Sequence, residues 1–309
     1  MRRLIITILL GCLAQVVMAN EGKSISDQLI CNSKKDSIVT TKYITKLQFF
    51  KPSIVIDKNQ VEVKLFNNLY TQTQFFDNQR RRTNLNTRST YYTGILQLLY
   101  GITNKINLGF HLFFRSVRID SEEAFPLTVF RFENNNIART TLSGIGPTIR
   151  IAPFKNNNHL SIQSCILIPA SSDMEGRING KPFLDYDKIT WWTQIFYDKV
   201  LPRNFIVFSE VDILWRLDKR FDLYQSILTT PLKVFAGKLI GKKWAGYAMT
   251  EWSPFWGTSI IDAHYLQTGA GLKYMIFNNL ELEILYTKFI YGMNSGAGET
   301  YNIGLRFLK

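Results

Sequence analysis

Cysteine and histidine are scarce in this sequence, and it contains no long hydrophobic run. Its 309 residues include three Cys and three His. Cys31 and Cys165, the two cysteines beyond residue 19, lie far apart and lack the spacing of metal ligands, so we predict no disulfide framework, no zinc site and no cofactor. No stretch reaches the roughly 18 apolar residues that a transmembrane helix needs, which excludes helical membrane spans.

The first 19 residues predict a secretory signal peptide. Arg2 and Arg3 precede an apolar stretch at 4–18, and small or aliphatic residues stand before a cleavage site after Ala19. Two alternatives are an uncleaved N-terminal anchor and lipoprotein processing at Cys12. Residues 20–58 follow as a segment with weak patterning.

From residue 60 onward the chain alternates apolar residues with polar or small ones at a period of two. Successive side chains of a β-strand point to opposite faces, so this alternation predicts strands with one apolar and one polar face. In 280–287, for example, Leu282 and Ile284 face one way while Glu281 and Glu283 face the other. We predict twelve strands at 60–76, 88–101, 105–118, 141–154, 159–169, 187–200, 204–217, 223–236, 244–254, 264–277, 280–292 and 299–308.

The connections between these strands alternate in length. Short links rich in Asn, Gly and Pro, such as 103–105 and 278–279, alternate with longer ones such as 77–87, 119–140 and 170–186. The link at 218–222 is short where a long one is due. Transmembrane β-barrels have short turns at one end and longer loops at the other. The fold class predicted is therefore all-β, a transmembrane antiparallel up-and-down barrel.

The polar faces of the strands carry charged residues that a closed barrel would direct into its lumen. They are interpreted as a pore lining that tunes permeation, and the alternative is a packed salt-bridge network that fills the lumen. The candidate pore-lining residues are Arg115, Arg150, Glu210, Asp212, Arg216, Lys233, Lys273, Glu281, Glu283 and Arg306.

Basic residues outnumber acidic ones throughout the chain. The formal charge is +13, and it is +11 without Arg2 and Arg3. No nucleic-acid motif accompanies this charge, so an anionic membrane surface is the expected partner. Four arginines flank the first long connection and are candidate contacts for lipopolysaccharide phosphates, with a solvated charge run as the alternative: Arg80, Arg81, Arg82 and Arg88.

Several stretches together resemble a known group of proteins. They are LLYGITNKINLGF at 98–110, LSGIGPTIRIAPF at 142–154, YDKITWWTQIFYDK at 186–199, YLQTGAGLKYMI at 265–276, LELEILYTKFIYGMNSGAG at 280–298 and YNIGLRFLK at 301–309. The chain resembles Gram-negative outer-membrane β-barrel proteins of the Bacteroidota type, a group of transporters, and more distantly barrels associated with phenol and hydrocarbon uptake. The resemblance implies location and architecture and carries no characterised binding residues.

Catalysis finds little support in the sequence. A nucleophilic Ser or Cys needs a positioned base, and no GxSxG motif occurs. His111 has no Ser two positions away on its own face, and His159 follows three Asn residues in a turn. His264 with Asp262 is the least poor catalytic pair, and a hydrogen bond at the barrel rim is the simpler interpretation. We therefore predict a protein that is not an enzyme.

These observations lead to one expected organisation. A signal peptide at 1–19 precedes a periplasmic or plug segment at 20–58 and a barrel at 59–309 in the cell outer membrane. The expected function is passive transport of small solutes by a monomer. The alternatives are a non-conducting structural or surface-binding barrel and, less favoured, an outer-membrane lipid hydrolase. The expected partners are outer-membrane lipid and lipopolysaccharide, with the barrel-assembly machinery during biogenesis, and no nucleic acid.

Overall fold

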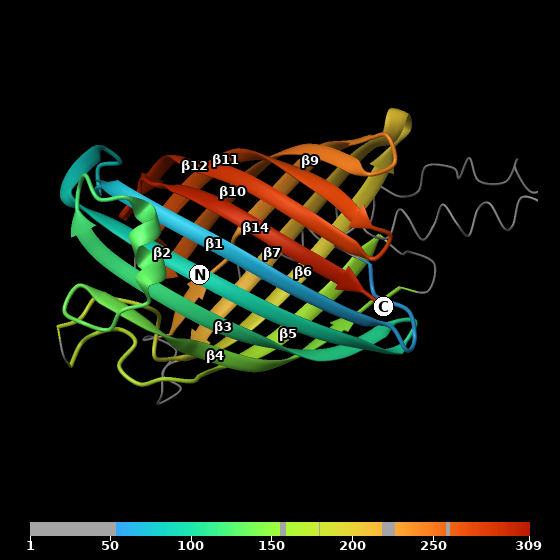
Figure 1. Ribbon diagram of the computed structural model, residues 1–309, viewed down its shortest axis with the longest axis horizontal. Coiled ribbons are helices and arrows are strands. Elements are labelled where there is room, and N and C mark those ends of the chain that lie inside the picture. Colours follow the sequence, from blue (N-terminus) through green and yellow to red (C-terminus); the bar gives the residue numbers. More distant parts are fainter. Residues whose placement is uncertain (1–53, 155–158, 179, 218–225, 258–259) are drawn as a thin grey trace, which may run out of the picture. The chain divides into compact units, whose positions relative to one another are not determined.

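The computed structural model describes residues 54–309 except 155–158, 179, 218–225 and 258–259 (Figure 1). The predicted signal peptide, most of the predicted plug segment and the link at 218–222 therefore lie outside the described residues. The β-strands are β1 Val61–Phe76, β2 Arg82–Thr103, β3 Ile106–Ser121, β4 Ala138–Ile151, β5 Leu160–Pro169, β6 Ile189–Leu201, β7 Phe205–Leu217, β8 Ile227–Thr229, β9 Leu232–Ile240, β10 Trp244–Gly257, β11 Ile260–Phe277, β12 Leu280–Met293, β13 Ser295–Gly296 and β14 Glu299–Leu308.

These strands close into a twelve-stranded antiparallel barrel, as the sequence predicts. Two of the twelve are interrupted. β8 and β9 both pair with β7 and β10, and they are separated at Thr230 and Pro231 because proline has no N–H to give to the ladder. β13 and β14 both pair with β1, and the pairing of β14 with β1 closes the barrel.

The two faces of each strand follow the predicted parity. On β12, Ile284 is 53% exposed on the outside of the barrel, whereas Glu281 is 3% exposed on the inside. On β14, Ile303 is 51% exposed and Arg306 only 7%. This arrangement, with an apolar outer surface and a polar interior, is the one expected for a barrel that is surrounded by hydrocarbon.

The connections differ between the two ends of the barrel. Short turns such as 104–105 and 278–279 lie at the end that we call the turn end, and the longer connections 122–137 and 170–188 lie at the opposite loop end. The first connection at the loop end was expected to be long and is a short turn at 77–81, because β2 begins at Arg82 and not at residue 88. β2 reaches further because its pairing with β1 resumes beyond a bulge between Gln72 and Gln74.

The connection after β3 packs on the outside of the barrel. It contains the short 3₁₀-helix η2, Pro126–Arg131, which crosses the outer face of neighbouring strands in Figure 1. Ser116 donates a hydrogen bond to the carbonyl of Val129, and Arg118 pairs with Glu133 at 2.8 Å. A second 3₁₀-helix, η3 at Pro202–Asn204, forms the turn between β6 and β7. None of the helices in the described part of the chain is long and apolar enough to cross a membrane.

Candidate functional site in the barrel lumen

The inward-facing side chains leave two adjoining cavities in the lumen. The inner cavity, nearer the turn end, has a volume of about 480 Å³, and the outer cavity, nearer the loop end, has about 410 Å³. Both volumes fall within the range of small-molecule sites. The cavities adjoin because the same side chains line both of them: Phe66, Asn68, Ile95, Trp192, Lys233, Glu251, Gln267 and Thr300.

A buried carboxylate organises the cations of the inner cavity. Glu62 on β1 is fully buried, and it lies 2.6 Å from Nε of Arg306 on the adjacent β14. Lys64 and Arg150 approach the same carboxylate at 3.1 and 3.5 Å. A buried charge is tolerated only with such partners, so these strands share one ionic network.

A second ionic network lies beside the first on the adjoining strands, where Glu281 is opposite Arg306 in the register. Lys273 on β11 is 3.4 Å from Glu281 and 3.3 Å from Glu283, both on the neighbouring β12. The hydroxyl of Tyr247 on β10 also donates to Glu283. The register places Lys273 opposite Glu283, and Glu281 lies two residues along β12 on the same inward face, so the cation meets both carboxylates.

The boundary between the cavities carries a third group of charges. Nζ of Lys233 on β9 lies 2.8 Å from Glu210 and 2.7 Å from Asp212, both on β7. Glu251 on β10 accepts hydrogen bonds from Tyr265 at 2.7 Å and Gln267 at 2.9 Å. This level of the lumen therefore holds three carboxylates around one ammonium group.

A chain of glutamines that sequence reasoning missed crosses the lumen at this level. Gln97 on β2 donates to Gln163 on β5 at 2.9 Å, and Gln163 donates to Gln194 on β6 at 2.7 Å. Gln194 then donates to Glu210 at 2.9 Å. The available signal was three glutamines at inward-facing positions, but their contact depends on which strands face each other across the lumen.

The outer cavity is covered in part by a loop that folds into the mouth of the barrel. Asp185 and Tyr186, from the connection at 170–188, line this cavity together with Arg115 and Arg216. The guanidinium of Arg139 on β4 holds the loop by donating to three of its carbonyls, those of Met174, Pro182 and Asp173, at 3.2, 3.2 and 2.7 Å.

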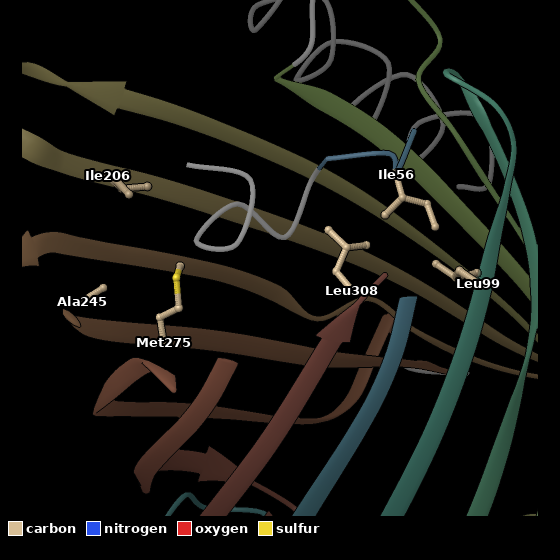
Figure 2. Close-up of a cluster of buried hydrophobic side chains, with 6 residues drawn as sticks. All are labelled: Ile56, Leu99, Ile206, Ala245, Met275 and Leu308. Atoms are coloured by element: carbon tan, nitrogen blue, oxygen red, sulfur yellow. The ribbon is translucent and has the colours of Figure 1, made fainter. Parts of the chain in front are cut away.

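An apolar cluster that contains Ile56 narrows the lumen at the turn end. Figure 2 shows Ile56 with inward-facing side chains from β2, β7, β10, β11 and β14: Leu99, Ile206, Ala245, Met275 and Leu308. The backbone of Ile56 is held by Asn107, which accepts from its N–H at 3.0 Å and donates to its carbonyl at 2.9 Å. We call Ile54–Asp57 the strap.

Gly101 allows the strap to approach the wall. A Cβ at this position of β2 would overlap the carbonyl oxygen of Asp57. Arg150 also reaches the strap, since its Nη1 lies 3.4 Å from the carbonyl of Ile54. The described end of the predicted segment 20–58 is thus part of the wall packing at the turn end.

The structure places every candidate pore-lining residue on a cavity wall. Arg150, Glu210, Lys233, Lys273, Glu281, Glu283 and Arg306 line the inner cavity, and Arg115, Asp212, Arg216 and again Lys233 line the outer one. Whether these cavities conduct solutes stays a prediction. Gln163, an almost fully buried member of the same networks, is not among the candidates.

The four arginines proposed to contact lipopolysaccharide have different partners. Arg81 pairs with Asp77 at 3.1 Å, and its backbone N–H, bonded to that carboxylate, holds the pKa of Asp77 below its ordinary value. Arg80 lies 5.8 Å from the ring of Tyr291, and Arg82 lies 5.2 Å from that of Phe76. Arg88 donates to the carbonyl of Glu122 and to Thr71. Their contact with lipopolysaccharide stays a prediction.

The histidines occupy three separate environments. His111 is buried, and its Nδ1 lies 2.6 Å from the hydroxyl of Thr148. His159 lies in the turn before β5, and its Nδ1 is 3.8 Å from Asp198 on β6. The carbonyl of His264 accepts a hydrogen bond from Ser295, and its ring lies 5.7 Å from that of Tyr291. Over the described ranges, no group of three or more His, Cys, Asp or Glu residues is placed to hold a metal ion.

Comparison with known proteins places the fold among outer-membrane barrels. No family model and no curated protein matches the sequence. An outer membrane channel from Pseudomonas putida F1 matches with a TM-score of 0.64 and 11% identity, over 84% of this chain and 98% of that one. The β-domain of the Bordetella autotransporter BrkA matches with a TM-score of 0.52 and 12% identity, over 81% and 99% of the two chains. At these identities the likeness concerns the fold.

Proposed function

We propose that this protein is a passive channel for small solutes in the outer membrane of a Gram-negative bacterium. The observation that carries the proposal is the pair of adjoining cavities in the lumen, about 480 and 410 Å³ in volume, whose walls carry charged and polar side chains. A barrel of this size can be filled completely by its side chains. A lumen that keeps room for solvent beside ionised groups suits the passage of polar solutes.

The apolar part of the wall bears on the kind of solute. Phe196, Phe208 and Phe235 lie beside one another on one side of the inner cavity, with ring centres 6.1 and 5.2 Å apart. Within the proposal, this apolar wall favours the binding of solutes that have an apolar part. The sequence resemblance to phenol- and hydrocarbon-uptake barrels points the same way, and membership of a Bacteroidota-type group is part of the same proposal.

The outside of the barrel supports a location in the membrane. Exposed apolar side chains such as Leu108, Ile145 and Ile284 form its outer surface. We propose that the turn end faces the periplasm, that lipid and lipopolysaccharide surround a monomer, and that the assembly machinery inserts it. Binding of nucleic acid and catalysis have no place in the proposed function.

A second candidate function is a non-conducting structural or surface-binding barrel. It is favoured by the packing of Ile56 against Leu99 and Leu308, because this cluster narrows the lumen at the turn end. In the channel, the same strap must move or leave a narrow passage. The two candidates therefore differ in what the strap does to ion flow.

Single-channel recording in planar lipid bilayers separates the two candidates. The channel predicts unitary currents from the purified protein, and larger currents from a variant that lacks residues 20–58. Gly101→Ala, which displaces the strap without a deletion, should also raise the conductance. Leu108→Ala on the outer surface is the matched control and should leave it unchanged. The absence of current from both the complete protein and the shortened variant would overturn the channel and support the non-conducting barrel.

A further inference from the structure

Two arginines from distant strands converge on consecutive residues of one loop in the outer cavity. Nη1 of Arg115, on β3, lies 3.1 Å from Oδ1 of Asp185. The guanidinium carbon of Arg216, on β7, lies 4.8 Å from the ring centre of Tyr186. Both side chains line the outer cavity, as does Lys188 at the end of the same loop, so its mouth is cationic.

The described residues leave part of the hydrogen-bonding capacity of these two guanidinium groups unused. Each carries five N–H donors. Within the described part of the chain, Nε of Arg115 is buried and has no hydrogen-bond partner. Arg216 donates to Thr229 at 3.0 Å and forms no ion pair with any described residue. Together with Asp185, the two arginines carry one net positive charge.

The other carboxylates that line the outer cavity are already engaged. Asp212 lies 2.7 Å from Lys233, and Glu251 accepts hydrogen bonds from Tyr265 and Gln267. They therefore do not compensate the two arginines at the mouth. An anion that enters the cavity from the loop end meets cations first, and the carboxylate-rich level around Lys233 lies deeper.

The loop that presents Asp185 and Tyr186 is held in place before any ligand arrives. Arg139 donates to three of its carbonyls, and the carboxylate of Asp187 accepts the N–H of Met174 at 2.9 Å. Asp185 then fixes Arg115 through its ion pair, and Tyr186 supports the planar group of Arg216. A site built before binding loses less entropy when the ligand is bound.

Part of the remaining wall of the outer cavity is apolar. Phe113, Trp192 and Leu214 line it, and the rings of Phe113 and Trp192 are 6.0 Å apart. The volume of about 410 Å³ accommodates a small molecule. The cavity thus offers a cationic end for an oxyanion and an apolar wall for a hydrocarbon part.

We propose that the outer cavity is a binding site for a small amphipathic carboxylate. Arg115 and Arg216 bind the carboxylate group, and the apolar part of the ligand packs against Trp192 and Phe113. Guanidinium groups bind carboxylates through paired N–H donors, and one monoanion neutralises the net charge that the two arginines and Asp185 carry together. The inference rests on the proposed channel function in that it names the class of solute that the channel takes up from outside.

The test measures equilibrium binding to the complete protein in detergent. Hexanoate is titrated by calorimetry, with 1-hexanol as the uncharged analogue and inorganic phosphate as an oxyanion without an apolar part. The expected result is that hexanoate binds and that the other two bind at least tenfold more weakly. Equal affinity for hexanoate and hexanol would overturn the role of the arginines, and equal affinity for phosphate would overturn the choice of an amphipathic ligand.

Substitutions of Arg216 assign the site. Arg216→Gln is expected to weaken hexanoate binding roughly tenfold or more, because a charge-assisted hydrogen bond is lost, and Arg216→Lys should restore part of it. Arg81→Gln is the matched control, since Arg81 lies in an exposed turn with its own carboxylate partner. Thermal unfolding of each variant checks that the barrel is intact. Hexanoate affinity within twofold of the unsubstituted protein in a folded Arg216→Gln variant would overturn the proposal.

The binding site and the channel function can be disproved separately. A protein that binds hexanoate and carries no current, either complete or without residues 20–58, keeps the site and overturns the channel. A protein that conducts, but whose conductance and binding are indifferent to hexanoate, keeps the channel and overturns the site. When both hold, hexanoate should reduce the unitary current of the unsubstituted protein and leave that of Arg216→Gln almost unchanged.

Discussion

Substitution of Asn107 by Leu tests how the strap is held at the turn end. Asn107 and Ile56 are both fully buried, and two hydrogen bonds of 3.0 and 2.9 Å join the side chain of Asn107 to the backbone of Ile56. Leu has nearly the same size and can make neither bond. The change therefore removes the two hydrogen bonds with little change in packing volume.

The size of the effect follows from these contacts. A typical intramolecular hydrogen bond contributes about 0.5–1.5 kcal/mol, so the loss of two lowers the free energy of strap opening by about 1–3 kcal/mol. The burial of Ile56, worth about 1.5–3 kcal/mol, continues to hold the strap in place. The strap should therefore remain mostly closed and open roughly 5–150 times more often.

Amide hydrogen exchange measures this opening directly. In a peptide covering 54–58, the amide of Ile56 should exchange roughly 5–150-fold faster in Asn107→Leu, while the amides of the barrel strands keep their rates. The matched control is Asn104→Leu, because Asn104 accepts from the N–H of Lys58 at 2.9 Å in an exposed turn. It should affect Lys58 and spare Ile56. Unchanged exchange at Ile56 in Asn107→Leu, or faster exchange throughout the barrel, would refute this account of the strap.

Three further predictions concern the outer surface and the loop end. Ile284→Lys should destabilise the barrel by about 2–4 kcal/mol in urea titrations of protein in lipid vesicles, and Ile284→Ala much less. Arg139→Ala should expose the loop at 170–188 to trypsin at Lys181 without lowering the melting temperature of the barrel. The hydrogen bonds of Asp77 to Arg81 lower the pKa of Asp77. The carboxylate therefore stabilises the turn at pH values above the ordinary Asp pKa. This contribution disappears only as the pH falls through the lowered pKa. An NMR titration in which Asp77 titrates normally would contradict it.

The faces of the strands could be predicted because their signal is local. The alternation in 280–287 is complete within eight residues, so Glu281 and Ile284 are assigned to opposite faces without knowledge of their neighbours. The same reasoning placed Arg115 and Arg216 inside. Register with the adjacent strand then brought Lys273 to Glu283, a pairing that follows once the order of the strands is known.

The start of β2 could not be predicted for a physical reason. The segment Arg82–Thr87 is polar apart from Leu85 and is mostly exposed, because this part of the strand extends beyond the apolar belt. Alternation disappears where the two faces have the same surroundings. A strand in that environment resembles a loop in sequence, although its hydrogen bonds to β1 continue.

The strap and the inward loop depend on contacts between residues far apart in the chain. Asn107 binds Ile56 from 51 residues away, and Arg139 reaches Met174 and Pro182 at separations of 35 and 43 residues. Neither Asn107 nor Arg139 belongs to a recognisable motif. Their partners are backbone groups, which every residue has, so the sequence contains no pattern that would identify these contacts.

The glutamine chain has a mechanical consequence for the barrel. It ties β2 to β7, which stand almost opposite each other around the circumference, so it acts as a cross-brace that resists flattening of the cylinder under lateral pressure from the bilayer. Each amide donates in the same direction toward Glu210. Reversal of one amide would place two acceptors or two donors opposite each other. All three hydrogen bonds must therefore run in the same direction for the chain to remain intact.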